Sequence, residues 1–180
     1  GKKDMVVQLL GYMGPHHTEK KISALILALR GRHAECVDCL LAVCPVDVAR
    51  GRCVWEGACV AGRMDLVQQG LRAPRSHYVA KKAVNEAAYG GHADIVALLL
   101  QQFSFGQRSM YGFLESAVFS QGRHSKRRWN PDVLALLLPR VGPDAKTQIL
   151  TTAVHIGAWT AAEIVYRSQT WGALADDLVA

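Results

Sequence analysis

Five cysteines and seven histidines are the residues of this 180-residue chain best suited to chemistry. Cys36 and Cys39 have the CxxC spacing, and Cys44 follows closely, so the cluster could hold a metal or act as a redox pair. No second pair of ligands lies at zinc-finger spacing, however, and a free cysteine packs as a small hydrophobic residue. We therefore expect these cysteines to lie in a hydrophobic core, and free thiols fit a reducing compartment.

Catalytic sequence motifs are missing from the chain. It contains no Gly-x-Ser-x-Gly, no His-Glu-x-x-His and no phosphate-binding loop. A cysteine nucleophile such as Cys44 or Cys53 would need a histidine brought close by the fold, and nothing near it in the sequence suggests one. The sequence thus predicts a protein that is not an enzyme and that has no metal and no cofactor.

A short basic segment, residues 121–130, offers a different chemistry. It carries four cations and a tryptophan: Arg123, Lys126, Arg127, Arg128 and Trp129. Arginine and tryptophan together suit phosphate groups, an acidic groove or single-stranded nucleic acid. The opposite interpretation is a solvated loop whose tryptophan packs back onto the protein. The net charge is +6, and it is uneven: residues 1–128 carry +8 and residues 129–180 carry −2. Binding of nucleic acid or an acidic partner through this loop and the positive first two-thirds is therefore the alternative function.

A pattern that recurs about every 30 residues indicates the elements that would position these groups. Two small residues are followed by a glycine-bearing turn, an acidic residue and an aliphatic run, most clearly over residues 87–100 and 58–71. The residues at the acidic position are separated by 31, 30, 29, 38 and 28 residues; they are Asp4, Glu35, Asp65, Asp94, Asp132 and Thr160. An insertion of about eight residues explains the long interval. Such a period predicts stacked units that bury their apolar faces against one another.

Each unit is expected to form two short helices. The first helix ends at the glycine turn, and the second helix begins near the acidic residue, which favours a helix N-terminus. Strand signals are nearly absent. We predict an all-α fold, an α-solenoid formed by one array over residues 1–180. The predicted parts are a partial unit 1–21, repeats at about 22–50, 51–80, 81–110, 111–145 (with the basic insertion 121–130) and 146–170, and a C-terminal cap or continuation 171–180.

The stretch Ala87-Ala88-Tyr89-Gly90-Gly91-His92-Ala93-Asp94-Ile95-Val96 closely resembles the helix-turn-helix core of ankyrin repeats. Residues 58–67 match it nearly as well, and the resemblance extends over about residues 4–166. The family's Thr-Pro-Leu-His opening is missing, and the period is near 30 rather than 33. The chain is therefore similar to a divergent, short-period ankyrin array. The resemblance implies helical hairpins whose projecting β-hairpin fingers are short or missing.

In ankyrin arrays the first helices line the concave side, and the resemblance implies that a partner protein binds there. Variable positions near each alanine pair supply the candidate contacts: Arg30, Glu56, Tyr89, Glu115, Phe119 and His155. Aromatic and charged side chains are frequent at interface hot spots. Tyr89 and Phe119 could equally pack against neighbouring elements. We expect a non-catalytic protein-interaction scaffold that is monomeric or part of a longer chain. Neither a signal peptide nor a membrane-spanning stretch is evident, so we expect an intracellular protein in the cytoplasm or nucleus.

Overall fold

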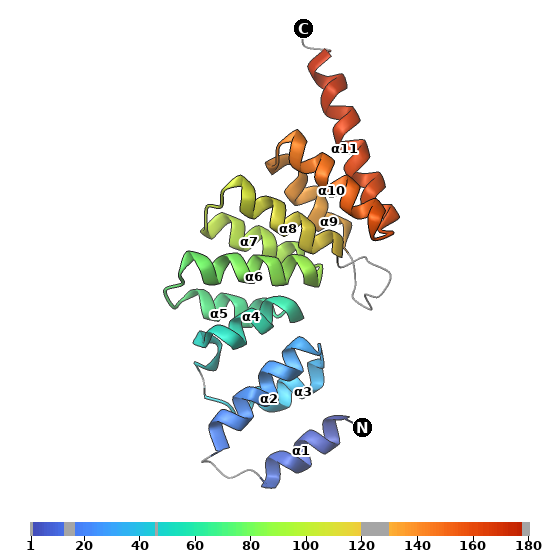
Figure 1. Cartoon of the computed structure of the whole chain (residues 1–180). Coiled ribbons are helices and arrows are strands. Elements are labelled where there is room, and N and C mark those ends of the chain that lie inside the picture. The colour runs from blue at the N-terminus through green and yellow to red at the C-terminus, as the bar shows by residue number, and fades with distance from the viewer. Residues whose placement is uncertain (1, 13–16, 46, 120–129, 178–180) are drawn as a thin grey trace. The chain divides into compact units, whose positions relative to one another are not determined.

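Helices are the only regular secondary structure in the part of the chain that the structure describes (Figure 1). This computed structural model describes residues 2–12, 17–45, 47–119 and 130–177, with the side chains of all these residues except 2, 49 and 170–177. Within those ranges, no helix combines the length and the apolar character needed to cross a membrane. The all-α prediction is confirmed for these residues.

The chain divides into two compact units, Gly1–Val79 and Ala80–Ala180. Unit 1 contains α1 (Lys2–Tyr12), α2 (Thr18–Arg30), α3 (Ala34–Leu41), the 3₁₀ helix η2 (Val48–Arg50), α4 (Arg52–Ala61) and α5 (Met64–Leu71). Helix α6 (His77–Gly90) begins at the end of unit 1, and unit 2 continues with α7 (Ala93–Gln102), α8 (Gln107–Phe119), α9 (Pro131–Leu137), η3 (Leu138–Arg140), α10 (Pro143–His155) and α11 (Trp159–Asp177). A single array over residues 1–180 stays a prediction.

The recurring acidic residues mark the starts of the second helices, as the sequence predicts. Glu35, Asp65, Asp94 and Asp132 each occupy the first turn of α3, α5, α7 and α9. A negative charge in the first turn is favoured by the partial positive charge of the free N–H groups there. A side-chain cap adds to this in α9, where the Asn130 side chain accepts a hydrogen bond from the Asp132 N–H at 2.9 Å.

Four first helices end in the same hydrogen-bonded turn. The backbone N–H of His33, Arg63, His92 and Ala158 donates to the carbonyl five residues earlier, which belongs in each case to an alanine: Ala28, Ala58, Ala87 and Ala153. The residue before each donor has positive φ, as in a Schellman motif; these are Gly62, Gly91, Gly157 and, without a glycine, Arg32 at 57°. The glycine turn is thus a backbone requirement that Arg32 meets at a conformational cost.

This turn gives the first testable prediction. Gly91 has a φ of 77°, so a Cβ at this position is strained, and Gly91→Ala is expected to lower the free energy of unfolding by about 1 kcal/mol. Gly106→Ala is the matched control, because Gly106 is not in the left-handed region and its added Cβ would meet nothing within 4 Å. Urea denaturation of both variants measures the difference. Equal stability of the two variants would contradict the turn assignment.

The core of unit 1 is arranged around Trp55 of α4, which is fully buried. Its indole Nε1 donates to the Val67 carbonyl of α5 at 3.0 Å, and the Arg75 guanidinium lies 4.7 Å from the ring centroid. Arg75 also donates to the Gly70 carbonyl at 2.8 Å and to the Arg50 carbonyl at 2.9 Å. One tryptophan and one arginine therefore tie α4, α5 and η2 together.

A glycine lets α2 and α4 approach closely. A Cβ added at Gly57 of α4 would lie 3.2 Å from Cβ of Leu29 in α2, so the helices meet where one side chain is missing. Helix α2 also packs on α3, and α4 packs on α5. In unit 1 each first helix is thus covered by its own second helix, and the two first helices pack on each other.

The elements of unit 2 pack in the same order. Helices α8 and α10 contact each other, α9 contacts both α7 and α11, and the pairs α8–α9 and α10–α11 are in contact. Helices α6 and α8 are joined by a hydrogen bond of 3.2 Å from the Ser116 hydroxyl to the Asn85 side chain. Phe113 of α8 is fully buried and packs edge-on against Phe105, with ring centroids 5.1 Å apart. The first helices of unit 2 form one layer and the second helices form another (Figure 1).

Candidate interaction surface

Two of the predicted partner-binding residues belong to unit 1, and they differ in exposure. Arg30 ends α2 and is exposed to solvent. Glu56 of α4 is only 2% exposed, and its carboxylate accepts a hydrogen bond from Arg52 Nε at 2.7 Å. The Arg52 guanidinium also lies 5.2 Å from the ring centroid of Tyr78. The surface above Glu56 therefore presents the cation of Arg52 rather than the carboxylate.

The contact with Glu56 also determines the proton affinity of Arg52. The hydrogen bond and the charge of Glu56 raise the pKa of Arg52 above its already high ordinary value, so this side chain stays positively charged. Removing Arg52 would leave the Glu56 carboxylate buried without this partner, which is strongly destabilising. Arg52 therefore keeps the buried carboxylate paired, while its own side chain is 46% exposed.

The four predicted residues of unit 2 lie on its first helices. Tyr89 and Glu115 are half-buried, Phe119 is 44% exposed, and His155 is exposed. Tyr89 and Phe119 are 30 residues apart and end the adjacent helices α6 and α8, which the Asn85–Ser116 hydrogen bond connects. We name Tyr89, Glu115, Phe119 and His155 the first-helix surface of unit 2. It combines aromatic, acidic and imidazole groups, a composition suited to protein recognition.

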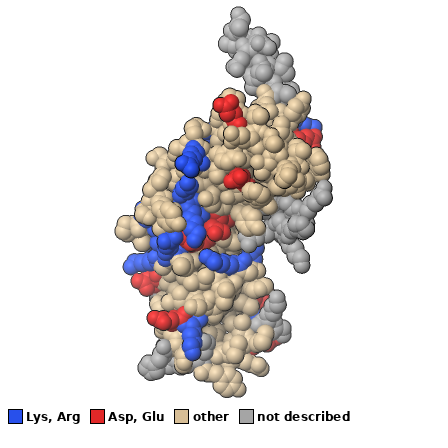
Figure 2. Space-filling model, viewed as in Figure 1, with Lys and Arg blue, Asp and Glu red and all other residues tan. Residues whose placement is uncertain are grey.

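The predicted basic loop falls outside the described residues. This applies to Arg123, Lys126, Arg127, Arg128 and Trp129. Its last residue, Asn130, is described and caps α9. On the face seen in Figure 2, Lys and Arg side chains stand beside Asp and Glu side chains, with broad uncharged areas between them. The described part of this face therefore carries charges of both signs.

The five cysteines differ in burial: Cys36 and Cys59 are buried, Cys39 and Cys44 are half-buried and Cys53 is exposed. The prediction of core packing is therefore confirmed for Cys36, and it is wrong for Cys39 and Cys44, which lie at the edge of the core. Burial raises the pKa of the Cys44 thiol, which keeps it protonated and a poor nucleophile at neutral pH. Among the described residues, no three metal-binding side chains come together.

Arg63 links the second helices α3 and α5. Its guanidinium contacts the Asp38 carboxylate at 2.6 Å and holds the Asp65 carboxylate with two hydrogen bonds of 3.0 and 2.8 Å. The hydrogen bonds from Arg63 lower the pKa of Asp65 below its ordinary value. Because the pKa is lowered in the folded state, this contribution to stability is present at neutral pH and is lost as the pH falls through the lowered pKa. The pairs are largely exposed, so their contribution is small.

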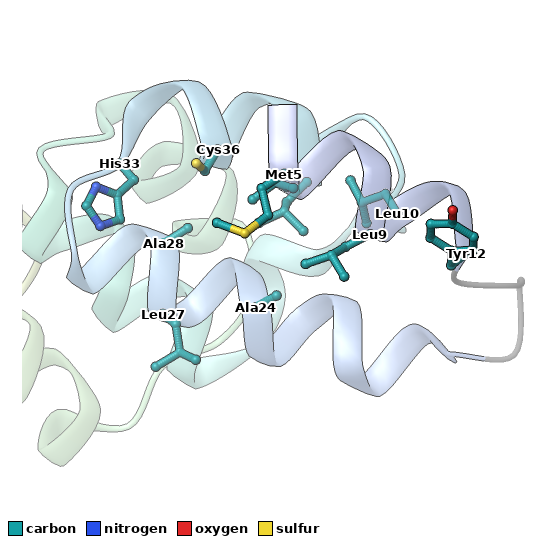
Figure 3. A pocket seen from close by; sticks show the side chains of 11 residues that line it. Met5, Leu9, Leu10, Tyr12, Ala24, Leu27, Ala28, His33 and Cys36 are labelled. Atoms are coloured by element: carbon teal, nitrogen blue, oxygen red, sulfur yellow. The ribbon is translucent and has the colours of Figure 1, made fainter. Parts of the chain in front are cut away.

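An apolar groove of about 620 Å³ lies between α1, α2 and α3 in unit 1. Figure 3 shows Met5 and Leu9 extending from α1 toward the side of α2 that carries Ala24 and Ala28. The lining is almost entirely apolar: Met5, Val6, Leu9, Leu10, Tyr12, Ala24, Leu27, Ala28, His33, Cys36 and Leu40. This groove is absent from the sequence-based set of candidate sites. The signal for it was residues 5–12 of α1, which contain no charged side chain.

The surface and the groove thus offer recognition chemistry, since they combine aromatic, apolar and paired charged groups. No protein-family model, no curated protein and no solved structure matched the chain.

Proposed function

We propose that the chain is a non-catalytic scaffold that binds another protein through the first-helix surface of unit 2. One observation carries the proposal: Tyr89 and Phe119 keep the same register on two adjacent first helices, and both reach the surface. The buried positions near the ends of these two helices are small or aliphatic: Ala87, Ala88, Ala117 and Val118. Aromatic rings at the helix ends therefore supply contact area that the core does not use.

We further propose that the helix pairs are repeats of one ankyrin-like α-solenoid. The support comes from the four Schellman turns, each placed after a buried alanine, and from the period of about 30 residues. Repeats of this kind stack because one unit has too little apolar surface to offset its ordering entropy. A stacked array presents its first helices as a continuous row, which suits a protein or peptide partner.

The experiment is affinity capture from the native cell with the full chain and with the variant that carries Tyr89→Ala and Phe119→Ala. We expect at least a tenfold loss of the captured partner, because truncating hot-spot aromatic residues costs 2 kcal/mol or more. Trp159→Ala is the matched control, since Trp159 is an exposed aromatic residue on the second helix α11. Thermal melting confirms that each variant is folded. A partner that the double variant retains in full would refute the proposed surface.

A further inference from the structure

Charged side chains on two first helices of unit 2 are separated by sign. Helix α6 carries Lys81 and Lys82 in its N-terminal half, and Glu86 follows one turn later. Helix α8 has the same order, with Arg108 in its first turn and Glu115 two turns later. All five residues are half-buried or exposed. On both helices the cations therefore lie toward the N-terminal end, and a carboxylate lies between them and the aromatic residue at the C-terminal end.

These charges are not neutralised within the described part of the chain. No described residue forms an ion pair or a side-chain hydrogen bond with Lys81 or Arg108. The same holds, among the described residues, for Glu86 and Glu115. Residues 120–129, which follow α8 in the sequence, contain four cations and no Asp or Glu. That segment therefore has no carboxylate side chain to offer to the cations of α6 and α8.

The cations of the two helices lie on neighbouring elements. The hydrogen bond from the Ser116 hydroxyl to the Asn85 side chain joins α8 to α6 and sets their register. In this register, residues 30 apart take equivalent places, so Arg108 lies one turn nearer the N-terminal end than Lys81. We name Lys81, Lys82 and Arg108 the basic row.

We propose that the partner of the first-helix surface of unit 2 places an acidic segment on the basic row and an apolar segment on the aromatic helix ends. This inference rests on the proposed function and adds the charge pattern of the partner. Opposite charges across an interface speed the encounter and fix the orientation of the partner.

The spacing of the two contact areas limits the length of the partner between its two segments. Lys81 and Tyr89 are eight residues apart on α6, which corresponds to about 12 Å along the helix axis. Arg108 and Phe119 are eleven residues apart on α8, which corresponds to about 16 Å. An extended peptide covers these distances in about four to five residues. The linker crosses the height of the carboxylates, so it is uncharged.

A peptide fits this pattern better than a nucleic acid strand. Phosphates follow one another along the whole strand, so a strand that reached the aromatic helix ends would bring negative charges close to Glu86 and Glu115. Like charges that face each other at an interface are costly. Helix α10 also limits the basic row, because it begins with charges of both signs, the exposed Asp144 and the half-buried Lys146. A short acidic segment therefore matches the extent of the row.

The test uses the full chain and a fluorescent, end-capped peptide of three glutamates, two glycines and three leucines. We expect saturable binding in fluorescence anisotropy that weakens as salt is added, because salt screens exposed charges. The double variant Lys81→Glu and Arg108→Glu should raise the Kd by about tenfold or more, since it turns two attractions into repulsions. Arg140→Glu with Arg167→Glu is the comparison: it changes the net charge equally at exposed residues of η3 and α11, and it should leave the Kd nearly unchanged.

Further probes give each outcome one meaning. A peptide with glutamines in place of the glutamates should not bind, and thermal melting checks that each variant is folded. Equal affinity of the two double variants, or no saturable binding, overturns the proposal. A single-stranded thymidine oligonucleotide that binds more tightly than the peptide, and that Lys81→Glu with Arg108→Glu weakens, would assign the basic row to nucleic acid and overturn it as well.

Affinity capture separates this inference from the proposed function. Lys81→Glu with Arg108→Glu should lose the same partner that Tyr89→Ala with Phe119→Ala loses. If only the aromatic variant loses it, the proposed function stands and the acidic segment is wrong. If the aromatic variant retains the partner while the peptide still binds through the basic row, the proposed function fails and the row remains a site for acidic peptides.

Discussion

Replacing Trp55 with alanine is expected to lower the free energy of unfolding by about 3–5 kcal/mol, the range for truncating a large buried aromatic residue. Trp55 is fully buried, and its loss opens a cavity at the junction of α4 and α5. The change also removes the ring beneath the Arg75 guanidinium and the hydrogen bond to the Val67 carbonyl. Because the free energy of unfolding of a domain is only about 5–15 kcal/mol, this single change removes a large part of it. Chemical denaturation followed by far-ultraviolet circular dichroism measures it.

Trp159→Ala provides the matched control for this prediction. Trp159 is 62% exposed and begins α11, so its truncation removes little buried surface. Its expected effect is within about 0.5 kcal/mol, as for most surface substitutions. Trp55→Phe is an intermediate case that keeps most of the buried ring but cannot donate to Val67. If Trp55→Ala and Trp159→Ala proved equally stable, the description of Trp55 as a buried core residue of α4 would be wrong.

Local structure follows closely from the sequence where backbone chemistry decides it. The sequence predicts Glu35, Asp65 and Asp94 near the starts of second helices, and all three lie in the first turns of these helices. The glycine turns are also local, because a positive φ after a helix strongly favours glycine. Arg32 is informative here, because it stands where Gly62 and Gly91 stand in later turns, yet the hydrogen bond from the His33 N–H to the Ala28 carbonyl still forms. The helix pair therefore determines the turn, and glycine only makes it easier.

Side-chain environments depend on contacts between distant residues, and the sequence pattern could not supply them. Glu56 aligns with Asn85 and Glu115, which are half-buried, but Arg52 and the packing of α4 bury Glu56 almost completely. Arg75 resembles an ordinary loop cation in the sequence, and its role depends on carbonyl groups 5 and 25 residues away. The groove on α1 was equally hidden, because an aliphatic run in a second helix predicts burial.

Replacing Phe113 with alanine is the second change expected to have a large effect, again about 3–5 kcal/mol of unfolding free energy. Phe113 is fully buried in α8, and the edge-on contact with Phe105 would be lost with the ring. Aromatic pairs of this geometry contribute beyond the area that they bury. Since α8 contacts both α9 and α10, the cavity opens inside unit 2 rather than at its surface. Urea denaturation of the full chain gives the magnitude.

Phe119→Ala is the matched variant for Phe113→Ala, because both remove a phenylalanine ring from α8. Comparing the two distinguishes an effect on stability from an effect on partner binding. Phe119 is 44% exposed, so its truncation should change the unfolding free energy by about 1 kcal/mol or less. If the proposed function is correct, Phe119→Ala weakens the capture of the partner although the variant stays folded. A Phe119→Ala variant as unstable as Phe113→Ala would mean that this ring packs in the core, and its place in the first-helix surface of unit 2 would have to be abandoned. A stable variant with reduced capture assigns the ring to recognition, because no loss of folding could then account for the lost partner.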